Sequence, residues 1–489
     1  MPAGFSASDF YYLLPELMLT GGALLVLLAD VLMPKRRGLL MWLSMATVVV
    51  TTLAVASFAG VETTSSRGLL AIDDFALFFK VVFLLSAAVT ILMSARYLEI
   101  EHVGAGEYYF LILCATLGMM FMASGIDLIT IFIGLETMAV SFYILAGYLK
   151  PNRRSNEASV KYFLLGAFSL GILLYGMSLM YGLTGTTNLR QIADVLQGQE
   201  RSALLVLALI LVGAGVGFKI AAVPFHMWAP DVYEGAPTPV TAFLSVGSKA
   251  ASFAMLLRIF MEGLVAVSAD WQILFYGLAV VTMTVGNIAA ITQSNIKRML
   301  AYSSIAHAGY VLIGIVPGTE RGVAATLVYL GVYLFMQLGA FAIVTMMRRR
   351  DVVGDELKDL SGLYFRSPVA AFAMLFFMLS LGGIPPTAGF MGKFWLFSAA
   401  IESGYVWLAV IAVINSAISL FYYIRVVVFM WIQEETLGSP IAIGPAMATA
   451  LAISVLGTLV LGLYPQFLFD QATQAARTLV AASSLATLQ

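Results

Sequence analysis

The sequence predicts an all-α polytopic membrane protein of about fourteen transmembrane helices, and three observations support this prediction. Hydrophobic residues make up 61% of the 489-residue chain and charged residues only 11%, whereas soluble domains carry about 25% charged residues. Apolar runs of roughly 17–25 residues, long enough to cross a bilayer, recur along nearly the whole chain. Two of these runs are interrupted by proline or glycine at corresponding places, which predicts two inverted five-helix repeats.

The composition excludes several classes of function. The formal net charge is −1, and no basic, aromatic-rich segment is present, so we expect no nucleic-acid partner. The single cysteine, Cys114, lies in an apolar run, which excludes disulfides and cysteine metal clusters. The three histidines have no paired spacing, so we expect no dedicated metal site. The N-terminus lacks a basic leader and a small-residue cleavage site, so the first apolar run is expected to direct membrane insertion.

The predicted spans are read from the apolar runs in order. They lie near residues 10–32, 39–59, 74–94, 108–124, 126–148, 158–181, 203–228, 237–262, 270–293, 299–316, 322–347, 368–401, 406–430 and 443–464. Between the sixth and seventh spans, Leu189, Ile192, Ala193 and Leu196 recur at helical spacing. This spacing predicts a short interfacial helix over Asn188 to Leu196.

The spans divide the chain into four parts. Residues 1–107 hold helices one to three, 108–262 the first repeat of helices four to eight, 263–430 the second repeat of helices nine to thirteen, and 431–489 the fourteenth helix and a tail. Because each repeat has an odd number of helices, the second repeat enters the membrane from the opposite face.

The fourth helix of each repeat is predicted to be broken. Pro224 interrupts the seventh helix, and the Gly-Gly-Ile-Pro-Pro stretch at 382–386 interrupts the twelfth. Lys219 precedes the first break and Lys393 follows the second, the order in which inverted copies would bring both charges to a similar depth. Interrupted helices in inverted halves are typical of transport paths.

Basic residues in the loops predict the orientation. Loops after odd-numbered helices carry Lys35, Arg36, Arg37, Arg96, Lys150, Arg153, Arg154, Lys161, Lys297, Arg298, Arg348, Arg349, Arg350, Lys358 and Arg366. Loops after even-numbered helices carry only Arg67, Arg190, Arg201 and Arg321. The positive-inside rule places the first set in the cytoplasm, so both termini are expected on the outer side.

Five ionisable residues fall well inside predicted spans: Glu136, Lys219, Lys249, His307 and Lys393. A charge at a helix centre costs roughly 2.5–3.5 kcal/mol on insertion scales, so such residues are functional candidates. Titratable groups spaced through the bilayer can pass protons between side chains and intervening waters. Movement of Glu136 relative to Lys219 would switch this lysine between holding and releasing a proton. We therefore predict a proton path along these five residues.

Each of the five also has a structural alternative. Glu136 and Lys219 could form a static ion pair that fixes helix packing, and Lys249 could be purely structural. His307 could hydrogen-bond a backbone carbonyl or a serine. Lys393 follows a break, where an ammonium could cap exposed carbonyls.

Other charges near the spans receive separate interpretations. The junction after the seventh helix contains His226, Asp231 and Glu234, which mark either a proton entrance or a solvated turn. Long side chains near predicted helix ends are expected to reach the interface, namely Lys80, Arg258 and Arg425, while Glu16 is ambiguous.

The glycines at 213, 215 and 217 do not form a dinucleotide fingerprint, because the final spacing and a preceding strand are missing. They are expected to permit close helix packing. No phosphate loop, flavin fingerprint or iron–sulfur cysteine set is present, so this chain alone cannot run redox chemistry.

The longest polar-containing stretches resemble a known family. These stretches are PFHMWAPDVYEGAPTPVTAFLSVGSKAA from Pro224, IKRMLAYSSIAHAGY from Ile296 and GGIPPTAGFMGKFWLF from Gly382. Over nearly its whole length the chain resembles the antiporter-like membrane subunits of respiratory complex I, the NADH–quinone oxidoreductase. The opening LLPELML and YLGVYLFMQLGAFAIV from Tyr329 resemble the subunit N family most closely.

The resemblance implies a proton channel built from two inverted five-helix units. By position, Glu136 and Lys219 match the family's glutamate–lysine pair, Lys249 the connecting lysine and Lys393 the terminal lysine. One sister family has a glutamate at the last position, and another has a long C-terminal extension with a lateral helix, which this chain lacks after Leu463.

The resemblance also implies the setting. The partners would be other membrane-arm subunits, including sister antiporter-like subunits, and the lipid bilayer of a bacterial inner membrane. No cofactor is expected in this chain, while FMN, iron–sulfur clusters and quinone would bind to partner subunits. The alternative is a cation/proton antiporter of the same fold outside a redox complex, and a structural spacer in the membrane arm is a third possibility.

Overall fold

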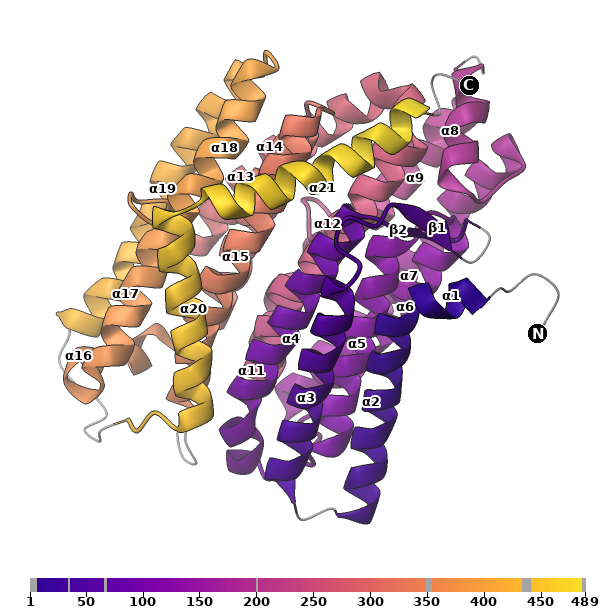
Figure 1. The fold of residues 1–489 in the computed structure, drawn as a ribbon. Coiled ribbons are helices and arrows are strands. Elements are labelled where there is room, and N and C mark those ends of the chain that lie inside the picture. The colour runs from indigo at the N-terminus through magenta and orange to yellow at the C-terminus, as the bar shows by residue number, and fades with distance from the viewer. Residues whose placement is uncertain are drawn as a thin grey trace.

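The computed structural model describes residues 7–33, 36–65, 68–198, 201–348, 354–432 and 441–485, and over these ranges the chain forms a bundle of helices (Figure 1). One small antiparallel hairpin, of β1 (Thr63–Ser65) and β2 (Leu70–Ile72), joins two of the first helices. The predicted all-α class is therefore confirmed. Lys35, Arg67, Arg349 and Arg350, which contribute to the predicted orientation, lie outside the described residues.

The N-terminal part holds α1 (Ala7–Tyr12), α2 (Leu14–Leu32), α3 (Arg37–Ala56) and α4 (Asp74–Ile100). Proline stands in the first turn of α2, where its missing N–H costs nothing. The Asp73 carboxylate accepts a hydrogen bond from the Ala76 N–H at 2.8 Å and so caps α4.

The next part holds α5 (Gly106–Ser124), α6 (Leu128–Ala146), α7 (Arg153–Thr184), α8 (Leu189–Gln197), α9 (Ala203–Lys219), α10 (Trp228–Gly235), α11 (Thr238–Phe243), the π-helix η1 (Leu244–Ser248), α12 (Lys249–Leu257) and a second π-helix, η2 (Arg258–Gly263). A helix is confirmed over the predicted stretch 188–196 as α8, whose Leu189, Ile192, Ala193 and Leu196 are buried, and its interfacial position stays a prediction. The short α10 was not predicted.

The third part begins with a 3-10 turn, η3 (Val265–Val267), and holds α13 (Ser268–Ile291), α14 (Ile296–Ile315), α15 (Glu320–Met347), a second 3-10 turn, η4 (Leu357–Leu360), α16 (Leu363–Arg366), α17 (Pro368–Gly382), α18 (Ala388–Glu402) and α19 (Val406–Trp431). α20 (Pro445–Leu463) and α21 (Gln466–Leu485) complete the chain.

The stretch predicted to be a tail is helical. α21 lies across the bundle, nearly perpendicular to α20 in Figure 1, and packs against α15, α4 and η2. It buries Ala472, Ala475, Ala476 and Leu479, which share one face at helical spacing. Because small alanines make up most of this face, hydropathy alone gave no signal for it.

In the described residues, eleven helices are long and apolar enough to cross a membrane. The predicted spans near 203–228, 299–316 and 368–401 correspond to α9, α14 and the pair α17 and α18, which are shorter or more polar. The predicted number of fourteen is therefore not confirmed by length and apolarity, and the division into four parts stays a prediction.

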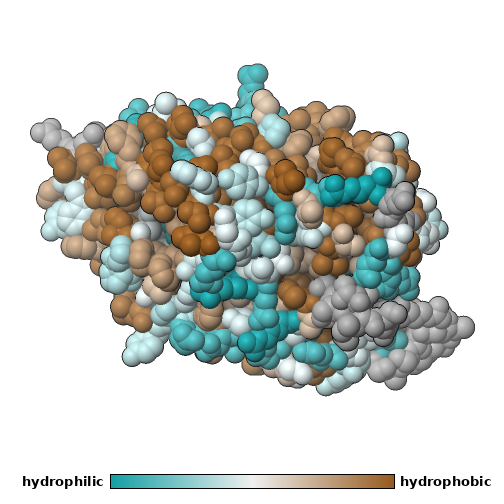
Figure 2. Space-filling model, turned by 90° about the horizontal axis from the view of Figure 1, so that it is seen from above, coloured by the Kyte–Doolittle hydropathy of each residue, from teal (hydrophilic) through white to brown (hydrophobic). Residues whose placement is uncertain are grey.

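The core runs through α11 to η2 and through α15, which are buried along almost their whole length, whereas most residues of α2 and α3 face outward. Seen from the end that carries α21, polar patches alternate with apolar residues (Figure 2). Of the five candidate residues, Lys249 lies on one of these fully buried helices, and the others lie on α6, α9, α14 and α18.

Candidate functional site

Lys219 is the last residue of α9, as its sequence predicted. The helix ends five residues before Pro224, which lies within the non-helical stretch 220–227, and the chain already turns at Ala221, whose φ is +58°. Two hydrogen bonds hold the non-helical stretch, from Trp228 Nε1 to the Phe218 carbonyl at 2.9 Å and from the Val223 N–H to Thr282 Oγ1 at 3.0 Å. Partners from α10 and α13 thus fix the break.

The Lys219 ammonium is buried and, among the described residues, has no hydrogen-bond partner. Its Nζ lies 5.9 Å from the centre of the Tyr143 ring and 6.0 Å from that of Phe218. Glu136, half-buried on α6, interacts with this charge at longer range, but within the described ranges no ion pair of 4 Å or less joins the two. The static ion pair considered above is therefore not the arrangement observed.

Lys249 directly follows the π-helix η1, and single π turns inside helices are frequent at functional sites. The buried Nζ donates to the Ser304 carbonyl and, at 2.6 Å, to Ser304 Oγ. Tyr233 OH lies 3.4 Å from the same hydroxyl oxygen. Lys249 of the first half is therefore joined to α14 of the second half.

His307 lies one turn after Ser303 and Ser304 on α14 and is hydrogen-bonded on both sides of its ring. Nδ1 lies 2.5 Å from Tyr329 OH and Nε2 lies 3.0 Å from Tyr423 OH. Tyr423 OH lies 2.6 Å from Ser303 Oγ. The partners are tyrosine hydroxyls, and neither the carbonyl nor the serine considered for His307 from the sequence binds the ring.

Lys393 on α18 reaches back to the broken end of α17. Its Nζ donates to the carbonyls of Leu381 and Gly382 at 3.1 and 3.0 Å and to Ser416 Oγ at 2.8 Å. The capping geometry considered above is thus present. Gly383 makes it possible, because its φ is +83° and a Cβ there would lie 2.9 Å from Lys393 Cδ.

The five residues therefore form two groups. Glu136 and Lys219 interact through charge, and Lys249 and Lys393 interact with His307 through charge. Hydroxyls also contact each of these three residues: Ser304 contacts Lys249, Tyr329 and Tyr423 contact His307, and Ser416 contacts Lys393. Hydroxyl groups both donate and accept, so they can relay a proton between nitrogen atoms. Among the described residues, no three His, Cys, Asp or Glu side chains come together to hold a metal ion.

Asp231 on α10 forms ion pairs. From the sequence, this residue was interpreted as part of either a proton entrance or a solvated turn. It accepts from Lys161 at 2.8 Å and from Arg298 at 2.7 Å, and Arg298 also contacts Glu234 at 3.0 Å. Burial alone would raise the pKa of Asp231, but the hydrogen bonds from Lys161 and Arg298 outweigh it, so the pKa is lowered. These ion pairs fasten α10 to α7 and α14, and a role in proton entrance stays a prediction.

A pH dependence follows from the lowered pKa of Asp231. A carboxylate with a depressed folded-state pKa contributes stability above its unfolded pKa of about 3.9, and loses it as the pH falls through the folded value. We expect Asp231→Asn to lower the melting temperature at pH 7 and to have a smaller effect near pH 3. Thermal unfolding of both proteins in detergent at these pH values tests this. An equal shift at both values would contradict the ion-pair assignment.

Some buried charges were missed from the sequence. Lys80 was expected to reach the interface but forms a buried ion pair with Glu16 at 2.7 Å. Arg258 was also expected there, but it is fully buried and donates to Asp73 at 2.7 Å and to Glu262 at 3.1 Å. The sequence does contain a signal for this pairing, because Glu262 follows Arg258 by four residues and so lies on the same helix face.

Arg425, the third basic residue expected near a helix end, does lie at one. Arg425 donates to the carbonyls of Ile291 and Gln293, where α13 ends. It therefore caps a helix end, as basic residues commonly do.

Comparison with known proteins gives consistent results. The family model described as "NADH:quinone oxidoreductase/Mrp antiporter, TM" matches residues 124–419. The chain is 49% identical to NADH-quinone oxidoreductase subunit N 1 of Koribacter versatilis over 95% of both chains. It is 47% identical to NADH-quinone oxidoreductase subunit N of Trichlorobacter lovleyi over 97% of this chain and 98% of that one.

Solved structures agree. A chain of respiratory complex I from Thermus thermophilus with bound aureothin matches with a TM-score of 0.79 at 33% identity, covering 93% of this chain and 98% of that chain. A chain of the Mrp complex from Dietzia sp. matches with a TM-score of 0.83 over 99% of both chains, and its 24% identity shows a shared fold alone.

Proposed function

Because the chain belongs to the family of NADH-quinone oxidoreductase N subunits, we propose that it conducts protons through its own helices while partner subunits perform the redox reaction. It is an antiporter-like membrane subunit of a respiratory complex I and assembles with other membrane-arm subunits. The observation that carries the proposal is the set of three buried lysines and one buried histidine beside two broken helices. Such groups are costly in a membrane and rarely serve packing alone.

The proposed route begins at Glu136 and Lys219 and continues to Lys249. From there the hydroxyls of Ser304, Ser303 and Tyr423 support transfer toward His307, and Lys393 is the final lysine. The unpartnered ammonium of Lys219 supports a mobile role, because a buried charge without a fixed partner responds strongly to a change in its neighbours.

The setting is part of the proposal. FMN, iron–sulfur clusters and quinone would be bound by partner subunits, and this chain would supply no redox centre. The excess of basic residues in the loops after odd-numbered helices supports a bacterial inner membrane orientation with both termini on the periplasmic side.

A cation/proton antiporter outside a redox complex is the second candidate, and the fold shared with the Dietzia Mrp complex favours it. Identities of 47–49% to N subunits along the whole chain favour the first candidate. Purification of the tagged chain from gently solubilised membranes separates them. The first candidate predicts flavin and iron–sulfur absorbance in the same fraction, and the second predicts neither.

Lys219→Ala tests the route in the assembled complex. We expect quinone-linked proton pumping in proteoliposomes to fall by about 10²-fold or more, because an obligatory proton carrier is lost. Lys150→Gln, an exposed change, is the matched control. Full pumping by a completely assembled Lys219→Ala complex would sink the proposal, while a loss confined to assembly would favour the structural spacer.

A further inference from the structure

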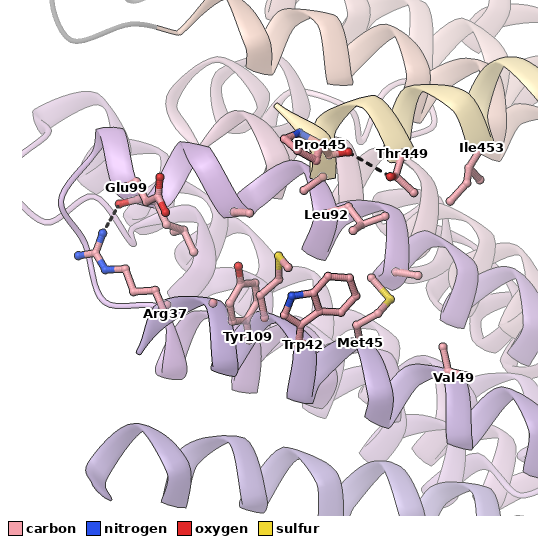
Figure 3. Close-up of a pocket in the computed structure, with 17 residues that line it drawn as sticks. Arg37, Trp42, Met45, Val49, Leu92, Glu99, Tyr109, Pro445, Thr449 and Ile453 are labelled. Carbon is pink, nitrogen blue, oxygen red and sulfur yellow. Dashed lines mark hydrogen bonds between the residues drawn. The ribbon is translucent and has the colours of Figure 1, made fainter. Parts of the chain in front are cut away.

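An apolar groove runs along the outside of the bundle, away from the proton route. It has a volume of about 640 Å³ and lies between α3 and α20, with α4 and α5 forming its floor. Figure 3 shows Trp42, Met45 and Val49 of α3 on one side and Thr449 and Ile453 of α20 on the other. Pockets of roughly 300–1,000 Å³ suit a ligand of several tens of atoms.

The helices that form this groove are expected to lie against the lipid bilayer. α3, α4 and α20 are long and apolar enough to span a membrane, and both walls are largely turned outward. Trp42 is 63% exposed and Val49 is 50% exposed. An acyl chain is therefore the first molecule that the groove meets.

One end of the groove is basic. Arg37 lines it and donates to the Leu98 carbonyl at 3.3 Å, and the preceding Arg36 is exposed. Arg96 is exposed on the adjacent turn of α4 and donates to the Ala442 carbonyl at 3.0 Å, just before α20. Arg37 and Glu99, the two charged residues of the lining, offset each other, and the excess positive charge at this end comes from the exposed Arg36 and Arg96, which adjoin the lining residues Arg37 and Ala95 in sequence.

We propose that this groove binds one anionic phospholipid, with an acyl chain against Met45, Val49 and Ile453 and its phosphate beside Arg37 and Arg96. Lipid tails are as apolar as the groove walls, so the chain alone gives little preference for one lipid over another. The preference comes from the headgroup, since basic pockets between transmembrane helices attract anionic headgroups. Trp42, which lies between Arg37 and Val49 in Figure 3, is a residue type enriched at the membrane interface.

Native mass spectrometry of the full chain in neutral detergent tests the proposal. The protein is titrated with phosphatidylglycerol or with phosphatidylcholine of identical acyl chains. We expect one phosphatidylglycerol to bind more tightly than phosphatidylcholine. The double variant Arg37→Gln with Arg96→Gln is expected to lose about fivefold in phosphatidylglycerol affinity per arginine removed, and Lys150→Gln none.

A second pair of variants tests the groove itself. Thr449→Trp places a large ring between α3 and α20 and is expected to reduce binding of both lipids, whereas Leu459→Trp, on another face of α20, leaves binding unchanged. Equal affinity of the wild-type chain for both lipids, or unchanged phosphatidylglycerol binding by Thr449→Trp, would overturn the proposal. So would a partner's transmembrane helix seated in the groove of the assembled complex. If the double arginine variant fails to fold, the proposal is still tested by the affinities of the wild-type chain for the two lipids and by the two tryptophan variants.

Discussion

Replacement of Lys249 by alanine is expected to stop proton transfer between the two halves of the chain. Lys249 bridges them, since it lies on α12 and, among the residues that the structure describes, donates only to Ser304 on α14. Removal of the amine takes away the group that passes the proton, so pumping should fall by about 10²-fold or more. The Ser304 carbonyl keeps its N–H donor within α14, so the variant loses only the hydrogen bonds from the ammonium, about 1.5–3 kcal/mol for a bond to a charged group, which is compatible with a folded protein. Pumping by reconstituted complex and assembly on native gels are the two measurements.

Lys249→Arg separates charge from proton transfer. Arginine keeps the positive charge but does not release its proton in proteins. We therefore expect Lys249→Arg to assemble and still fail to pump, which a purely structural lysine would not show. Recovery of pumping by the arginine variant would mean that the charge alone matters, and the handover role of Lys249 would have to be abandoned.

The membrane helices and the five ionisable residues within them could be predicted because their signals are local. A run of twenty apolar residues crosses a bilayer whatever surrounds it, and a lysine inside such a run needs no partner to be noticed. The end of α9 at Lys219 and the break after Gly382 follow from nearby glycine and proline, although tertiary hydrogen bonds end α9 earlier than Pro224 suggests.

The partners of those residues could not be predicted, because they come from distant parts of the chain. Ser304 lies 55 residues from Lys249, and Tyr423 lies 116 residues from His307. Nothing in the composition of 238–263 indicates π-helical segments, which arise where packing forces an extra residue into a turn. The helical tail was missed because alanines, weak in hydropathy, form its buried face.

Asp73, a partner of the buried Arg258, also comes from a distant part of the chain. The second large effect is predicted for replacement of this arginine. Arg258→Ala is expected to lower the free energy of unfolding by about 3–5 kcal/mol, because Asp73 loses its buried counter-charge and Glu262 keeps only the pair with Arg190 at 2.7 Å among the described residues. Arg258 is fully buried, donates to Asp73 and Glu262, and stacks over the Phe75 ring at 4.5 Å. Chemical unfolding of the full chain in detergent, followed by tryptophan fluorescence, measures the loss.

A matched exposed pair and a double variant distinguish the buried charge from ordinary contact loss. Arg201 pairs with Asp270 and its side chain is 65% exposed. Arg201→Ala should therefore lower the free energy of unfolding by about 1 kcal/mol or less. Arg258→Met combined with Glu262→Met removes both charges of the buried pair and should recover part of the loss, since apolar replacement of a buried pair is often neutral. Arg190, which pairs with Glu262 at 2.7 Å, is 35% exposed and can turn its charge to the surroundings. In this double variant Asp73 still lacks its buried counter-charge, although it keeps the hydrogen bond from the Ala76 N–H. We therefore expect stability to recover in part. If Arg258→Ala costs no more than Arg201→Ala, the buried arginine does not hold these helices together.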